Sequence, residues 1–264
     1  MPNEGTGSLP RIWTIAKNAF REAVRDRILY NLILFVLLIT LSAIFLGEMT
    51  AGQEARVIVD LGLSSVLVFG TFISIFVGVS LVWKEIEKRT IYSIFSKPVG
   101  RSEFIIGKYL GLCLTLLVNV AVMGVGVTLA LLYVGGQRFA AAIWPAVLLI
   151  FLELTITTAV GIMFSSFSTP ALSALLTFFV FVIGHFSASL RDMAAELGSD
   201  RAKFIFDATY YLVPNLSHFS YITETASGIA APGAMIGGAV IYAIVYDVIL
   251  LTVTIVIFSR RNFK

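Results

Sequence analysis

Two acidic side chains stand inside long apolar stretches of this sequence, where an ionised group is costly. Glu153 lies near the centre of residues 143–164, and Asp247 lies midway along residues 235–258. A carboxylate at the centre of a bilayer costs roughly 2.5–3.5 kcal/mol on insertion scales, so each must face protein or water. Each could be a cation or proton relay, or a polar point on a transport path. Alternatively, each is a hydrogen-bonded carboxyl that holds helices together. For Asp247 this second interpretation is favoured, because Tyr246 stands beside it in the sequence.

Residue types that bind soft metals are present, but they are scattered. They lie far apart along the chain and share no spacing typical of metal ligands, which favours ordinary packing roles. The single cysteine, Cys113, lies in an apolar run and cannot form a thiolate cluster alone. We therefore expect no metal site. The side chains considered for copper are His185, His218, Met163, Met193 and Met235.

The segment from Gly100 to Lys108 superficially resembles a phosphate-binding loop. Such a loop needs G-x-x-x-x-G-K followed by Ser or Thr. Here Gly100 and Gly107 are too far apart, and Tyr109 stands where the hydroxyl ligand is needed. No other pattern of this kind occurs, so we expect no ATPase activity in this chain. Any ATP must be hydrolysed by another polypeptide.

The composition is that of a membrane protein. Of 264 residues, 58% are hydrophobic and only 13% are charged, about half the charged fraction usual in soluble domains. The fold class expected is all-α, a polytopic membrane protein with one domain. The net charge of +3 is small, and its distribution indicates topology rather than nucleic-acid binding.

Six apolar stretches are long enough to cross ~30 Å of hydrocarbon as helices. The amphipathic segment 11–27 precedes them and is predicted to be an interfacial elbow helix, with Trp13 at the headgroup level. The region 191–233 starts with charges and continues with aromatic residues, which predicts short helices in the extracytoplasmic interface. The six predicted spans are about 28–46, 61–83, 104–134, 143–164, 171–190 and 235–258.

The distribution of Lys and Arg predicts the orientation. Five lie before the first span, six lie from Lys84 to Lys108 at the junction of the second and third spans, and three lie after the last, which together make fourteen of nineteen. Because basic residues favour the cytoplasmic side, both termini are predicted to be cytoplasmic.

The segment 84–103 is the most charged part of the chain and must lie in water. Within it, Ile86, Ile91, Ile94 and Phe95 recur at near-helical spacing, which predicts a short amphipathic helix. Pro98 and Gly100 should end it, and Ser102 is the predicted N-cap of the next helix. The apolar side of so short a helix either binds a partner protein or rests on the membrane surface.

Three motifs in and after this segment resemble those of a known family. They are E-x-E-x-x-T from Glu85, S-K-P-x-x-R from Ser96, and G-K-Y-x-G from Gly107 to Gly111. Together they resemble the cytoplasmic loop between the second and third helices of type-2 ATP-binding-cassette (ABC) permeases, which in that family is the coupling element that docks on the ATPase subunit. They are most similar to permeases that serve multicopper-enzyme maturation, such as that of nitrous oxide reductase.

This resemblance implies a permease that works as a homodimer in a prokaryotic inner membrane, with two copies of a separate ATPase subunit. ATP and Mg²⁺ would bind to that subunit, and this chain would hold no cofactor. Export is the direction expected, and an extracytoplasmic partner protein is an open possibility. The residues implied to contact the ATPase are Glu85, Ile86, Glu87, Lys88, Arg89, Thr90, Ile91, Ile94, Phe95, Pro98 and Arg101.

Two other functions stay open from the residues alone. A proton-coupled secondary transporter would use Glu153 or Asp247, although the sequence shows no inverted repeat of the kind such transporters carry. A membrane anchor could instead transmit force from an ATPase to an extracytoplasmic protein, with the aromatic region 200–225 as its docking surface. No residue identifies a transported substrate.

Overall fold

The structure is a computed structural model. It describes residues 8–25, 52–87, 100–187, 189 and 213–260, and six single positions between 26 and 51. The described elements are all helices, with no strand among them, which confirms the predicted all-α class.

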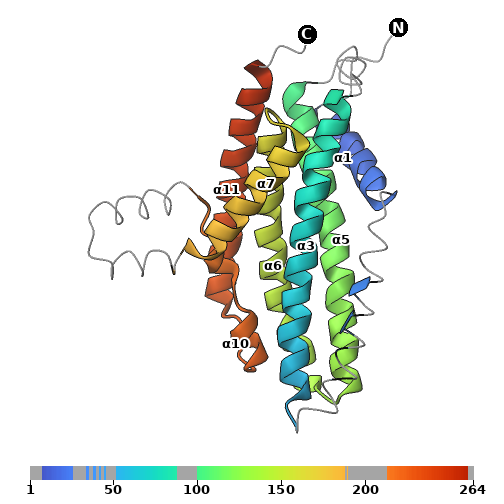
Figure 1. The fold of residues 1–264 in the computed structure, drawn as a ribbon, viewed down its shortest axis with the longest axis vertical. Coiled ribbons are helices and arrows are strands. Elements are labelled where there is room, and N and C mark those ends of the chain that lie inside the picture. Colours follow the sequence, from blue (N-terminus) through green and yellow to red (C-terminus); the bar gives the residue numbers. More distant parts are fainter. Residues whose placement is uncertain are drawn as a thin grey trace, which may run out of the picture.

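In the part of the chain that the structure describes, four helices are long and apolar enough to cross a membrane. They are α3 (Glu54–Glu87), α5 (Arg101–Tyr133), α6 (Gln137–Ser165) and α11 (Gly233–Arg260), and they run side by side along the long axis of the molecule (Figure 1). They coincide with the second, third, fourth and last predicted spans, so these four helices are confirmed.

The other two predicted spans have different outcomes. The fifth, predicted at 171–190, contains the apolar helix α7 (Pro170–His185), which is shorter than a membrane-crossing helix. The first, predicted at 28–46, lies outside the described residues except at isolated positions. Six spans therefore stay a prediction.

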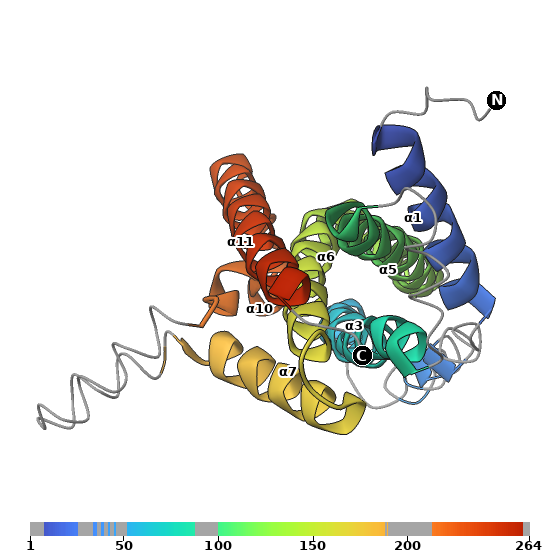
Figure 2. The same ribbon diagram turned by 90° about the horizontal axis from the view of Figure 1, so that it is seen from above.

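Helix α6 is the centre of the bundle. It packs against α3, α5, α7 and α11, and most of its side chains are buried, whereas few side chains of α11 are. Seen from above, α6 lies between α5, α3, α7 and α11 (Figure 2). Substitutions on α6 therefore disturb protein packing, whereas most of α11 is available to lipid or to another chain.

Helix boundaries differ from the prediction at two turns. Helix α5 begins at Arg101 with Gly100 as its N-cap, so the prediction of Ser102 was wrong. The Glu103 carboxylate accepts the Gly100 backbone N–H at 2.9 Å, which satisfies that donor without a Ser hydroxyl. The connection between the third and fourth predicted spans, which would cover 135–142, is much shorter, because Gly135 has a positive φ of 77° and α6 starts at Gln137.

The amphipathic helix α1 (Ser8–Arg25) lies along α5, near the end of the bundle where α5 begins. Its alanine face is buried, since Ala16, Ala19 and Ala23 are at most 2% exposed. Trp13 is 63% exposed on the other side. The predicted amphipathic helix is therefore present, and its apolar face packs on protein.

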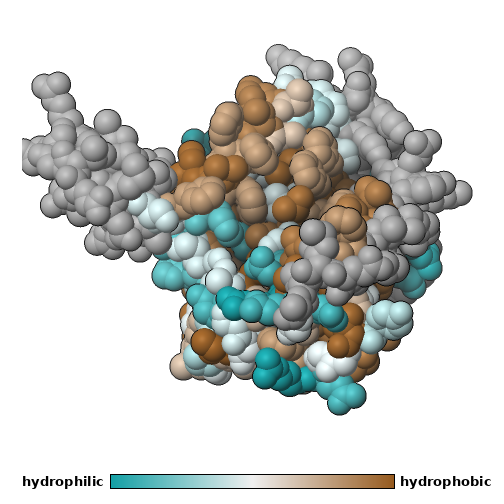
Figure 3. Space-filling view, turned by 60° about the horizontal axis from the view of Figure 1, so that its bottom comes forward, coloured by the Kyte–Doolittle hydropathy of each residue, from teal (hydrophilic) through white to brown (hydrophobic). Residues whose placement is uncertain are grey.

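Short helices occur in the described part of the region 191–233, as the sequence predicts. They are η1 (Leu216–Phe219) and α10 (Ile222–Ala226). Helix α10 lies with the first residues of α3 and α6 at the end of the bundle opposite the end of α11 (Figure 1). Figure 3, turned so that this end comes forward, shows hydrophilic surface gathered there and hydrophobic surface on the flank above it. Such a distribution is typical of a chain that passes from lipid into water.

Candidate functional site

The predicted coupling segment, 84–103, starts as a direct continuation of α3. The helix extends seven residues beyond its membrane-crossing part, Glu54–Ser80, and ends at Glu87. Glu85, Ile86 and Glu87 therefore lie on its last turn. The implied contacts Lys88, Arg89, Thr90, Ile91, Ile94, Phe95 and Pro98 lie outside the described residues.

Arg101, the last residue implied to contact the ATPase, binds the C-terminal end of α11. One guanidinium nitrogen, Nη1, donates to the carbonyl oxygens of Phe258 at 3.1 Å and Ser259 at 2.6 Å. The last carbonyls of a helix have no partner within it and carry the negative end of its dipole, so a cation there is stabilising. The rings of Phe104 and Phe258, both buried, stack 6.0 Å apart beside this contact. The end of the coupling segment is thus joined to the last helix.

The G-K-Y-x-G motif packs against α1. A Cβ atom on Gly111 would lie 2.5 Å from the Ala16 carbonyl oxygen, and one on Gly107 would lie 2.7 Å from Ile15. Only glycine allows the two helices to approach this closely. Between them, the 4% exposed Lys108 donates to the Glu22 carboxylate at 3.4 Å. The motif therefore has a packing role within this chain.

Glu153 on α6 is 1% exposed, and its Oε1 lies 3.1 Å from Nδ1 of His185, the last residue of α7. The His185 ring is also stacked on Phe181, with centroids 5.8 Å apart. A buried carboxyl with a hydrogen-bonding partner is far less costly than an isolated one. The pair joins the central helix to α7, and the sequence analysis did not predict it.

Asp247 on α11 is 8% exposed and faces α5 and α6. Its carboxyl lies against the side chains of Tyr109 and Thr155, with Cys113 next to Tyr109. Within the described part of the chain, its Oδ1 has no hydrogen-bond partner. The side chain is therefore a polar point between three helices, and its neighbour is Tyr109 rather than Tyr246.

The two carboxyls do not form one site. Glu153 faces α7, whereas Thr155, which faces Asp247, lies two residues further along α6. Two residues correspond to about 200° around a helix, so Glu153 and Thr155 lie on different faces of α6. Asp247, which lies against Thr155, is therefore on the other side of α6 from the Glu153 carboxyl. A third polar contact, the 2.9 Å hydrogen bond between Ser74 and Thr158, joins α3 to α6. A polar path through Glu153 and Asp247 stays a prediction.

Sequence reasoning also missed a polar cluster around Asn215, before η1. The Asn215 side chain accepts from Ser187 at 2.7 Å, and its backbone N–H donates to the Tyr242 hydroxyl at 2.8 Å. The cluster joins the end of α7 to α11. Among the described residues, no three His, Cys, Asp or Glu side chains lie close enough together to hold a metal ion.

Comparison with known proteins connects this arrangement to a family. A Pseudomonas aeruginosa protein named as a probable ABC transporter permease, NosY, is 27% identical over 107 residues, which is 39% of each chain. The family described as ABC-2 family transporter protein matches residues 13–263. The matched residues run from α1 to the end of α11, so the resemblance noted in the three motifs is confirmed, and the chain belongs to the ABC-2 transporter family.

Proposed function

We propose that this chain is the membrane permease subunit of an ABC transporter, driven by a separate ATPase subunit. The observation that carries the proposal is the family match over residues 13–263. The four long apolar helices support it, since they and the family indicate a multi-pass membrane protein. Export is the proposed direction, with both termini in the cytoplasm, as the distribution of Lys and Arg predicts.

The proposed mechanism starts at the coupling segment between α3 and α5. ATP-driven closure of two ATPase subunits would push this segment in each copy of a permease homodimer. Two copies are proposed because each chain supplies one coupling segment, whereas a pair of ATPase subunits offers two docking sites. The contacts of Arg101 with α11, and of Gly107 and Gly111 with α1, support rigid transmission of that push to both helices.

A pull-down of the ATPase tests this proposal. The double variant Ile94→Asp, Phe95→Asp should abolish co-purification, because interface energy is concentrated in a few buried large side chains. The control is Leu9→Asp, which adds a charge at a residue of α1 that is already 78% exposed. Leu9→Asp should retain the ATPase. Wild-type affinity in the double variant, in a monodisperse sample, would refute the proposed docking segment.

A further inference from the structure

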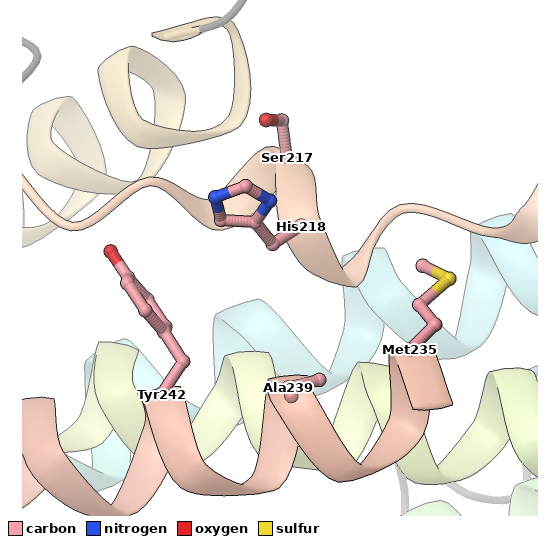
Figure 4. A pocket seen from close by; sticks show the side chains of 6 residues that line it. Ser217, His218, Met235, Ala239 and Tyr242 are labelled. Carbon is pink, nitrogen blue, oxygen red and sulfur yellow. The ribbon is translucent and has the colours of Figure 1, made fainter. Parts of the chain in front are cut away.

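A pocket of about 440 Å³ lies between η1 and the first three turns of α11 (Figure 4). Its volume falls in the range of about 300–1,000 Å³ that is usual for small-molecule sites. Figure 4 shows the His218 ring on one side, and Tyr242, Ala239 and Met235 on the helix opposite. The lining residues are Ser217, His218, Met235, Gly238, Ala239 and Tyr242.

The Asn215 side chain fixes the polar wall of this pocket. Its Oδ1 accepts three hydrogen bonds, from the Ser187 hydroxyl at 2.7 Å and from the backbone and hydroxyl of Ser217 at 3.1 and 2.6 Å. These donors identify the oxygen of the amide, so the amide nitrogen is the atom that lies 3.3 Å from Nε2 of His218.

This contact determines which nitrogen of His218 carries the proton. An amide nitrogen can only donate, so Nε2 of His218 accepts, and the proton of the neutral ring is on Nδ1. Among the described residues, Nδ1 has no hydrogen-bond partner. His218, an exposed residue of this wall, therefore carries one N–H donor that a ligand could use.

The opposite wall is apolar and open. Met235 contributes a thioether, Ala239 a methyl group and Tyr242 an aromatic ring. A Cβ on Gly238 would meet no atom within 4 Å, so the pocket has free space above this glycine. Among the described residues that line the pocket, none is a lysine, arginine, aspartate or glutamate. A charged ligand would gain no counter-ion from these residues, whereas an uncharged ligand needs none.

We propose that this pocket binds an uncharged amphipathic molecule. Its hydrocarbon part lies on α11, and an ester or ketone oxygen accepts from Nδ1–H of His218. This site goes beyond the proposed transport function, since it requires neither ATP nor the ATPase. The ligand can come from the bilayer, as a glyceride, or from the aqueous phase, as a small ester.

Photo-crosslinking tests the site in the full chain, reconstituted in nanodiscs of dioleoylphosphatidylcholine. The probe is a monoacylglycerol with a diazirine on its acyl chain, and mass spectrometry measures its labelling of residues 213–242. Gly238→Leu should lower this labelling at least about tenfold, because the leucine fills the pocket. Gly237→Leu is the matched control, since a Cβ there also meets no atom within 4 Å, but Gly237 is not a lining residue.

A second variant tests the donor separately. His218→Phe keeps an aromatic ring against Tyr242 and removes the N–H, so labelling should fall about threefold to tenfold, the net value of one hydrogen bond. Competition by unlabelled diolein would identify the bilayer as the source, and competition by water-soluble triacetin would identify the aqueous phase. Equal labelling of the Gly237 and Gly238 variants, or no competition by either compound, would overturn the proposal.

Discussion

The contact between α1 and α5 allows a quantitative test at Gly111. The substitution Gly111→Ala adds one methyl group at the point where the two helices are closest. That carbon would lie 2.5 Å from the Ala16 carbonyl oxygen and 2.6 Å from the Ala19 methyl carbon. The oxygen belongs to the backbone of a helix, so it cannot move away alone, and α1 as a whole must shift.

The magnitude follows from this overlap. Ordinary van der Waals contacts begin at about 3.4 Å, so α1 must move by about 1 Å, and forcing an extra methyl group into a packed interface typically costs about 1–3 kcal/mol. The loss should appear mainly as local opening of α1, because the long helices α3, α5 and α6 bury their own core without it. Such a loss makes local opening about fivefold to 150-fold more frequent.

Hydrogen exchange of residues 8–25 in detergent measures this opening directly. Exchange of these amides should be faster in Gly111→Ala by the factor above, while exchange in α6 stays as in the wild type. Gly124→Ala is the control on the same helix, because a Cβ there lies 3.4 Å from the Val147 side chain, an ordinary contact. If Gly111→Ala and Gly124→Ala exchange alike, the close approach of α1 to α5 is wrong.

Three further predictions concern other contacts. Glu153→Leu should lower the free energy of unfolding by about 1–3 kcal/mol, because His185 loses its buried partner, whereas Glu153→Gln should be near wild type. Thermal unfolding in detergent compares the two variants, and wild-type stability of Glu153→Leu would contradict the pairing. Arg101→Ala should speed hydrogen exchange at residues 254–260, because the carbonyl oxygens of Phe258 and Ser259 lose their donor, and Arg101→Lys should do so less. Unchanged exchange in Arg101→Ala would show that Arg101 does not cap the C-terminal end of α11. In a Cys113→Ala background, a cysteine at Gly136 should be labelled from outside intact cells and one at Gly100 should not; the reverse pattern refutes the predicted orientation.

The long helices could be predicted because hydrophobicity is a local property of the sequence. The third span was expected at 104–134 and is found at Arg101–Tyr133. The fourth and fifth predicted spans, 143–164 and 171–190, leave a break at 165–170, and α6 ends at Ser165 and α7 begins at Pro170. The exact first residue of a helix was predicted wrongly where a single hydrogen bond decides it. At Gly100 the Glu103 carboxylate accepts the backbone N–H, in place of the expected serine hydroxyl as cap.

The contacts between helices could not be predicted from local pattern alone. Glu153 and His185 are 32 residues apart, and nothing in their spacing selects this partner over another. A signal was nonetheless present, since a histidine in an apolar helix also needs a polar partner. Two small-residue stripes, the alanines of α1 and the glycines of G-K-Y-x-G, likewise marked surfaces that allow close packing.

The structure divides the motifs by which this chain resembles ABC permeases into two groups. Gly107, Lys108 and Gly111 contact α1, and Tyr109 faces Asp247, so the G-K-Y-x-G motif is explained by contacts within the chain. Arg101 is likewise bound to the end of α11. The inference of an ATPase contact therefore rests on the residues from Glu85 to Pro98. A substitution in G-K-Y-x-G that weakens ATPase binding would do so by moving α1 or α11, and hydrogen exchange in those helices distinguishes this from a lost direct contact.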